Sequence, residues 1–180
     1  FTLHNYVDLF TDSNFLASVG RSIAMSIIPI IVTIVIVLLA LFVTAIYFPK
    51  LEKYVQIICM IPYTIQGVIL SVSILSLYVG SSSILSNRLV MLMGAYCIVI
   101  LPYIYQGIRN GMRAVNMPTL IEAAEMLGAS KIYAFFRVVV PNILSAIIVS
   151  SLLAVGIIFG DYVLIRNLAG TSAPNMQIFL

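Results

Sequence analysis

Long runs without charge constrain this chain more than any other feature of its sequence. Residues 22–49, 54–87, 89–108 and 138–160 contain no Asp, Glu, Lys or Arg, and a helix of about 20 apolar residues crosses the hydrocarbon of a membrane. Only 8% of the residues are charged and 62% are hydrophobic, whereas a soluble domain carries roughly 25% charged residues. This composition excludes a free-standing soluble domain and a disordered chain. We therefore predict an all-α integral membrane protein, a polytopic helical bundle in which residues 1–180 form one domain.

The uncharged runs predict four membrane spans, over residues 23–48, 55–79, 89–108 and 142–164. Residues 1–15 are too few and too polar to cross, and we expect them to lie along the membrane surface. Because the chain opens on Phe1 and a new apolar run begins near its end, we expect a helix to be missing from each end.

The charges between the spans predict their orientation. Four spans place the loops 49–54 and 109–137 on one side, and loops rich in Lys and Arg stay in the cytoplasm. The net charge of +3 is too small and too scattered to favour nucleic-acid binding. The predicted cytoplasmic cations are Lys50, Lys53, Arg109, Arg113, Lys131 and Arg137, and those on the opposite side are Arg21, Arg88 and Arg166.

The inner loop, residues 109–141, carries signals for two short helices. Thr119, followed three residues later by Glu122, forms a capping-box pattern that predicts a helix start. Gly128 can end that helix in a left-handed conformation, and Ser130 can cap a second helix that leads into the last span.

The first of these helices offers a surface for a partner. Leu120, Ile121, Ala124 and Leu127 would give it a small apolar face, which charged residues rim. An amphipathic helix beside a membrane docks in a protein groove or lies on lipid. Lipid binding favours a basic polar face, and two Glu on the rim argue against it, so we expect a cytosolic protein partner. The rim is Arg113, Glu122, Glu125 and Lys131.

The same loop carries a spaced motif. Glu122-Ala123-Ala124 is followed, after three residues, by Gly128, and nine residues later by Val138-Val139-Val140-Pro141. This resembles the EAA motif of the permease subunits of bacterial ATP-binding cassette (ABC) importers, with Val138 and Val140 as mild departures from Ile and Leu. Prolines at Pro62 and Pro102 and the outer segment near residues 5–15 extend the resemblance.

The resemblance implies the ABC importer permease fold and a cytoplasmic coupling helix. It further implies that this helix seats in a cleft of a cytosolic ABC ATPase dimer, that a second permease subunit (identical or different) completes the path, and that an extracytoplasmic solute-binding protein delivers the solute. The location implied is the bacterial inner (plasma) membrane. The implied ATPase-coupling interface is Thr119, Leu120, Glu122, Ala123, Ala124, Leu127 and Gly128.

No catalytic motif is present, so we do not expect an enzyme. The sequence lacks the Gly-x-x-x-x-Gly-Lys loop that cradles nucleotide phosphates. We therefore expect no cofactor on this chain and expect ATP and Mg to be used by the partner subunit. His4 has no ligand companions, so no metal site is expected.

Five residues inside the spans have both a functional and a structural interpretation. Pro62 and Pro102 could act as hinges or could only kink their helices. Gln66 and Gln106 could line the solute path or hydrogen-bond between helices. Asp161 could meet the solute, or pair with Arg166 or another span end.

The solute class is predicted from a general likeness of sequence, and no specific motif carries it. The outer segment and the stretch around Asp161 resemble the branch that handles polyamines, ferric iron and thiamine, and Asp161 favours a cationic solute. The alternatives are an ion-gradient-driven secondary transporter or channel subunit and a receptor or scaffold without transport. The former would carry charged residues or broken helices near mid-membrane, which this sequence does not display.

Overall fold

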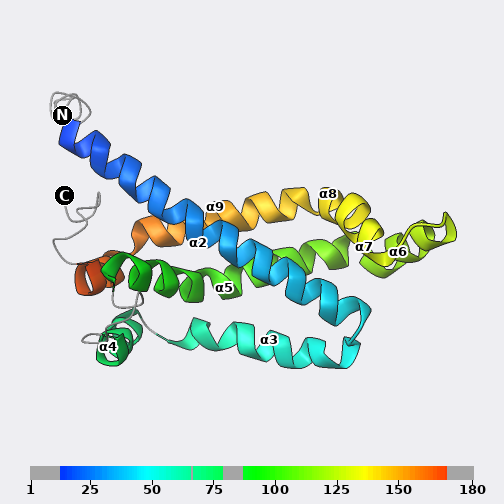
Figure 1. Cartoon of the computed structure of the whole chain (residues 1–180), viewed down its shortest axis with the longest axis horizontal. Coiled ribbons are helices and arrows are strands. Elements are labelled where there is room, and N and C mark those ends of the chain that lie inside the picture. Colours follow the sequence, from blue (N-terminus) through cyan, green and yellow to red (C-terminus); the bar gives the residue numbers. More distant parts are fainter. Residues whose placement is uncertain (1–12, 66, 79–86, 170–180) are drawn as a thin grey trace. The chain divides into compact units, whose positions relative to one another are not determined.

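The computed structural model describes residues 13–65, 67–78 and 87–169, and every regular element in them is helical (Figure 1). The long helices are α2 (Ser13–Ile46), α5 (Arg88–Ala114) and α9 (Leu144–Gly160). This confirms the predicted all-α membrane fold. The shorter elements are η1 (Pro49–Leu51), α3 (Glu52–Met60), η2 (Ile61–Thr64), α4 (Gly67–Tyr78), α6 (Met117–Met126), α7 (Lys131–Ala134), η4 (Phe135–Val139), α8 (Val140–Asn142), α10 (Tyr162–Leu164) and η5 (Ile165–Ala169).

The helices form two compact units. Unit 1 consists of Phe1–Pro29, Ile65–Ile98 and Val155–Leu180, and unit 2 consists of Ile30–Thr64 and Val99–Ala154. In unit 1, α10 and η5 pack on α4, where the side-chain amide of Asn167 donates to the Ser71 hydroxyl at 2.8 Å. The core of unit 2 is aromatic and aliphatic, with the rings of Phe42 and Phe135 4.8 Å apart.

Helix α2 shows the pattern of a membrane helix, with small polar residues inside and large apolar residues outside. Ser22, Ser26 and Thr44 are buried, and each hydroxyl donates to a carbonyl four residues earlier in the same helix. Hydrocarbon solvates an apolar face at no cost, whereas an unsatisfied hydroxyl there is expensive. The exposed face is Ile23, Ile27, Ile28, Ile31, Val32, Val35, Ile36, Leu39 and Val43.

Two helices of the described residues are long and apolar enough to cross a membrane, at Phe15–Ile46 and Arg88–Ala114. The number rises to four if each of two interrupted helix pairs counts as one span. Helix α2 starts ten residues before the predicted boundary at residue 23. The expected surface segment, residues 1–15, lies outside the described residues except for its last three, which belong to α2.

The predicted span over residues 55–79 is not one continuous helix. Helix α3 ends at Met60, η2 follows it, and α4 begins only at Gly67. Pro62 lies in η2, and a proline has no N–H for the helical hydrogen bond and clashes with the preceding turn. The tight η2 turn therefore replaces the α-helix at the proline.

Helix α5 runs past the predicted end of its span at Ile108 and reaches Ala114. The sequence boundary was set by the first charge, Arg109, which marks the limit of an apolar run but does not end a helix. The last predicted span, 142–164, is also divided. Helix α9 begins after a bend of 64° that separates it from the segment Lys131–Asn142, and it ends at Gly160.

Candidate functional site

The inner loop folds into α6 and α7, but α6 begins earlier than the capping box predicted. Its N-cap is Asn116, in the left-handed region with φ 49°, and Pro118 stands in the first turn. Proline favours this position because its missing N–H is not needed there and its φ is already helical. Thr119 therefore lies inside the helix, and the prediction that it caps α6 is wrong.

The end of α6 matches the prediction made for Gly128. This glycine has a φ of +85°, its N–H donates to the Glu125 carbonyl at 2.9 Å, and the N–H of Ala129 donates to the Ala124 carbonyl at 3.0 Å. These two bonds form a Schellman motif, which satisfies carbonyls that the helix end leaves free. Gly128 thus sets the turn between α6 and α7, as the sequence indicates.

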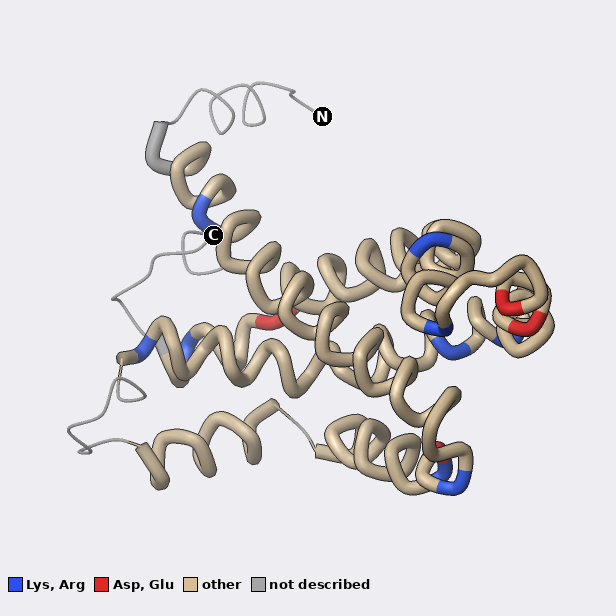
Figure 2. Tube along the Cα trace, turned by 45° about the vertical axis from the view of Figure 1, so that its right-hand side comes forward, with Lys and Arg blue, Asp and Glu red and all other residues tan. Residues whose placement is uncertain are grey.

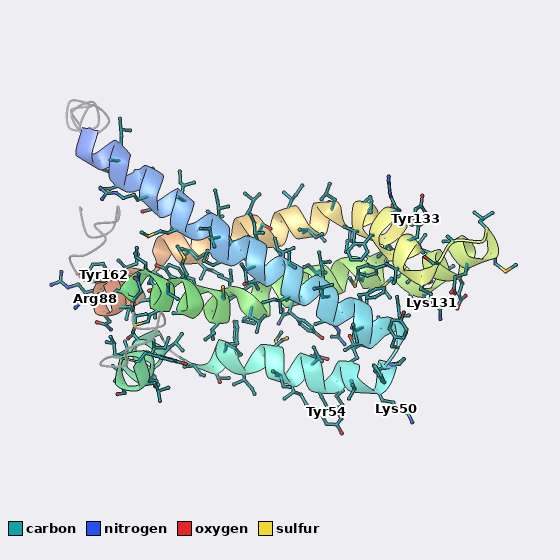
Figure 3. The ribbon with its side chains drawn as sticks, in the orientation of Figure 1. Lys50, Tyr54, Arg88, Lys131, Tyr133 and Tyr162 are labelled. Atoms are coloured by element: carbon teal, nitrogen blue, oxygen red, sulfur yellow. The ribbon has the colours of Figure 1, made fainter. Side chains whose placement is uncertain are left out.

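The start of α7 also agrees with the sequence. Ser130 is its N-cap, and the Ser130 hydroxyl accepts a hydrogen bond from the N–H of Tyr133 at 3.3 Å. The chain then passes through the π-helical turn η4 into α8 and α9. The ion pair between Lys131 and Glu125, 3.9 Å apart, links α7 back to α6. Figure 3 labels Lys131 and Tyr133, which project on opposite sides of the ribbon at this turn.

The predicted interface residues divide between a buried face and an exposed tip. Ala124 and Ile121 are buried within unit 2, so Ala124 supports the packing of α6, and its place in an ATPase interface stays a prediction. Leu127, expected on the same face, is 90% exposed, and its neighbour Met126, which the sequence reasoning missed, is 89% exposed. The remaining predicted residues are exposed or half-buried: Thr119, Leu120, Glu122, Ala123 and Gly128.

Two adjacent apolar side chains, Met126 and Leu127, are almost fully exposed at this tip when only the described residues surround them. Two exposed acidic residues precede them on α6: Glu125 comes directly before Met126, and Glu122 comes four residues before it. The tip that we define as Met126 and Leu127 is therefore apolar with acidic residues beside it. Contiguous exposed apolar side chains rimmed by polar residues are typical of interaction sites, whereas single ones are not.

The charged residues of unit 2 gather at the end that holds α6, α7 and the start of α3 (Figure 2). This confirms that the loops 49–54 and 109–137 lie at the same end of the unit. The side of the membrane that this end faces stays a prediction. The sequence reasoning missed one member, Glu52, whose carboxylate accepts from the Arg109 guanidinium at 2.7 Å and 2.9 Å and lies 3.5 Å from Arg113.

An open groove with a volume of about 550 Å³ runs between α5 and the α8–α9 segment. Gln106 lines it, and the Gln106 amide also donates to the sulfur of Met60 on α3 at 3.1 Å, so both interpretations of this residue keep support. Gln66 lies outside the described residues. The polar side chains that line the groove carry no charge: Tyr103, Gln106, Asn110, Asn142, Ser145 and Ser150.

Two glycines bring α5 and α9 into close contact beside this groove. A Cβ atom on Gly107 would lie 2.5 Å from the Ser150 Cβ, and one on Gly111 would lie 2.6 Å from the Ala146 Cβ. The four-residue spacing on both helices is the small-residue pattern by which membrane helices approach closely. The spacing Gly107-x-x-x-Gly111 is readable in the sequence, although Arg109 and Asn110 between the glycines place it at the end of the uncharged run and not inside it.

The remaining predicted residues have local structural roles. Asp161 caps α10, since its carboxylate accepts from the N–H of Leu164 at 3.0 Å. Pro62 lies at the interruption after α3, whereas Pro102 is buried inside the continuous α5. Their roles as hinges stay predictions. Among the described residues, no group of three His, Cys, Asp or Glu side chains could hold a metal ion.

The comparison with protein families covers nearly the whole of this architecture. The model of the family described as binding-protein-dependent transport system inner membrane component matches residues 23–179. A search of curated proteins finds no match. The matched region contains α5, α9, most of α2, and the α6–α7 turn with its exposed tip. The chain therefore belongs to the family of binding-protein-dependent transport system inner membrane components.

Proposed function

We propose that this chain is the permease subunit of an ABC importer in which α6 is the coupling helix, driven by a cytosolic ATPase dimer. Family membership supports a permease role. The observation that carries the coupling role is the tip of α6, where Met126 and Leu127 are about nine-tenths exposed at the charged end of unit 2. Burying one such side chain in a partner's cleft contributes about 1.5–3 kcal/mol.

The rigidity of the α6–α7 turn supports a mechanical role. The Schellman motif at Gly128 and the Ser130 cap fix both ends of the turn, and Ala124 and Ile121 anchor the inner face of α6 in unit 2. A push on the tip is then passed to α5 and α9, the helices that the loop joins. ATP and Mg belong to the partner subunit in this scheme, and a solute-binding protein supplies the solute from the other side of a bacterial inner membrane.

The groove between α5 and α9 is the segment of solute path that we assign to this chain. Exposed amides such as Gln106 and Asn110 are costly against hydrocarbon, so a path enclosed with a second permease subunit suits them better than lipid. A small solute such as a polyamine, ferric iron or thiamine stays a prediction from the sequence, as does a contact of the solute with Asp161.

Co-purification with an ATPase activity tests the proposal. Tagged protein extracted from its own membranes is expected to carry an ATPase subunit, and the double variant Met126→Gln/Leu127→Gln is expected to lose it. A cost of about 2 kcal/mol for an apolar anchor corresponds to roughly 30-fold weaker binding.

Tyr54→Gln is the matched control, because Tyr54 is an exposed side chain at the same end of unit 2 but lies on α3 (Figure 3). It should leave ATPase recovery unchanged. Equal recovery with the double variant and the wild type would contradict the coupling role of α6.

A further inference from the structure

Glu52 forms an ion-pair cluster between helices that are far apart in the sequence. One oxygen of its carboxylate accepts from Nη2 and Nε of Arg109, at 2.7 Å and 2.9 Å, and lies 3.5 Å from Nη2 of Arg113. Glu52 is the first residue of α3, whereas both arginines lie in the last turns of α5. The cluster therefore fastens the start of α3 to the end of α5.

This cluster differs from an ordinary surface ion pair. The Arg109 side chain is only 15% exposed, and Glu52 is 37% exposed. Hydrogen bonds to charged groups strengthen as water is excluded, and a partly buried charge left without its partner is costly. Arg109 and Arg113 are one helical turn apart, so both guanidinium groups reach the same carboxylate.

The cluster also lies directly beside the start of α6. Glu52, Arg109 and Arg113 line a pocket of about 300 Å³ together with Asn116, Met117 and Pro118. The N–H of Asn116 donates to the Arg113 carbonyl at 3.1 Å, and the Asn116 carbonyl accepts from the N–H of Leu120 at 3.3 Å. The backbone between Arg113 and the first turn of α6 is therefore short, and these hydrogen bonds link Arg113 through Asn116 to Leu120.

We infer that Glu52 is a positioning residue that ties α3 to the coupling helix, so that α3 moves with α6 and α5 as one body. The inference rests on the proposed function of α6, since a tie has a mechanical purpose only if a partner pushes that helix. Without the cluster, α3 keeps weaker contacts with α5, such as the hydrogen bond from the Gln106 amide to the sulfur of Met60, and its first turn can lag behind α6.

A distance measurement on the full chain in lipid nanodiscs tests this tie. Spin labels are placed at Tyr54→Cys on α3 and Ala123→Cys on α6, both exposed, in a background with Cys59→Ala and Cys97→Ala. The starting chain is expected to give one narrow distance distribution. Glu52→Gln keeps the shape of the side chain but removes its charge, and it is expected to broaden the distribution.

Two further variants separate the tie from a general loss of structure. Lys53→Gln removes the neighbouring exposed charge and should leave the distribution narrow. The double substitution Glu52→Arg/Arg109→Glu exchanges the two charges and so restores an ion pair between α3 and α5. It should narrow the distance distribution again. If Glu52→Gln fails to fold, Arg113→Gln, which leaves the Arg109 bonds in place, should give an intermediate width.

A distribution as narrow in Glu52→Gln as in the starting chain would overturn the inference, and so would equal broadening by Lys53→Gln. Because no ATPase is present, these outcomes do not depend on the coupling role of α6. If that role is wrong and the tie is right, the distances change as described while no ATPase binds the tip of α6.

Discussion

Gly128 and Gly156 both have open space where a Cβ atom would stand, yet their backbone conformations differ. No heavy atom lies within 4 Å of either position, but only Gly128 has a positive φ, at +85°. An L-residue in the left-handed region costs about 1–2 kcal/mol, whereas alanine is preferred to glycine inside a helix by roughly 1 kcal/mol. Alanine substitutions at these two positions therefore differ in backbone strain, while neither of them introduces steric crowding.

Gly128→Ala is expected to loosen the α6–α7 turn. The strain of about 1–2 kcal/mol should speed amide hydrogen exchange in residues 117–134 by roughly 5- to 30-fold, which mass spectrometry of the corresponding peptides measures. Gly128→Asn should have a smaller effect because asparagine tolerates this conformation. Gly156→Ala should not speed exchange in this region, and equal exchange in Gly128→Ala and the starting chain would show that the turn does not need a positive φ.

At the scale of elements, the contact between α5 and α9 is set by backbone approach. Gly107 and Gly111 face Ser150 and Ala146 at distances that leave no room for another carbon atom. The Ser150 hydroxyl bonds back to the Ala146 carbonyl at 2.8 Å, so it does not need a partner across the contact. Separating α5 from α9 would lose these close packing contacts and would therefore be energetically costly.

Gly107→Ala is expected to destabilise the protein, because its Cβ would lie 2.5 Å from the Ser150 Cβ. Overpacking costs about 1–3 kcal/mol, which should lower the apparent melting temperature in detergent. Adding Ser150→Gly removes the opposing carbon and should recover part of the loss. Gly94→Ala, in open space on the same helix, should not lower the melting temperature, because alanine favours the helix over glycine. Additive effects of the two substitutions would argue against direct contact between these positions.

Features set by neighbouring residues could be predicted from the sequence, whereas contacts between residues far apart in the chain could not. Gly128 and Ser130 were assigned correctly because turn and cap signals act within a few residues. Thr119 was misplaced because Pro118 provided a competing helix start. Glu52 and Arg109 are 57 residues apart, and no local pattern joins them. The exposure of Met126 likewise depends on which face of α6 the rest of unit 2 covers.

At the scale of the whole molecule, the membrane-type helices and the charged end of unit 2 have different roles in the function that we propose. The long helices present apolar faces that suit hydrocarbon, as α2 shows, while the charged residues of unit 2 gather around α6 (Figure 2). Family membership gives this arrangement a transport role. We propose that force enters the molecule at the tip of α6.

Site-specific photo-crosslinking in the intact transporter tests that claim most directly. Leu127 is replaced by the photoreactive residue p-benzoylphenylalanine, with Tyr54 replaced in the same way as the control, and crosslinked partners are identified by mass spectrometry. The account predicts an ATPase subunit crosslinked at position 127 and far less at position 54. No ATPase adduct at position 127, or an adduct there with the solute-binding protein, would contradict it.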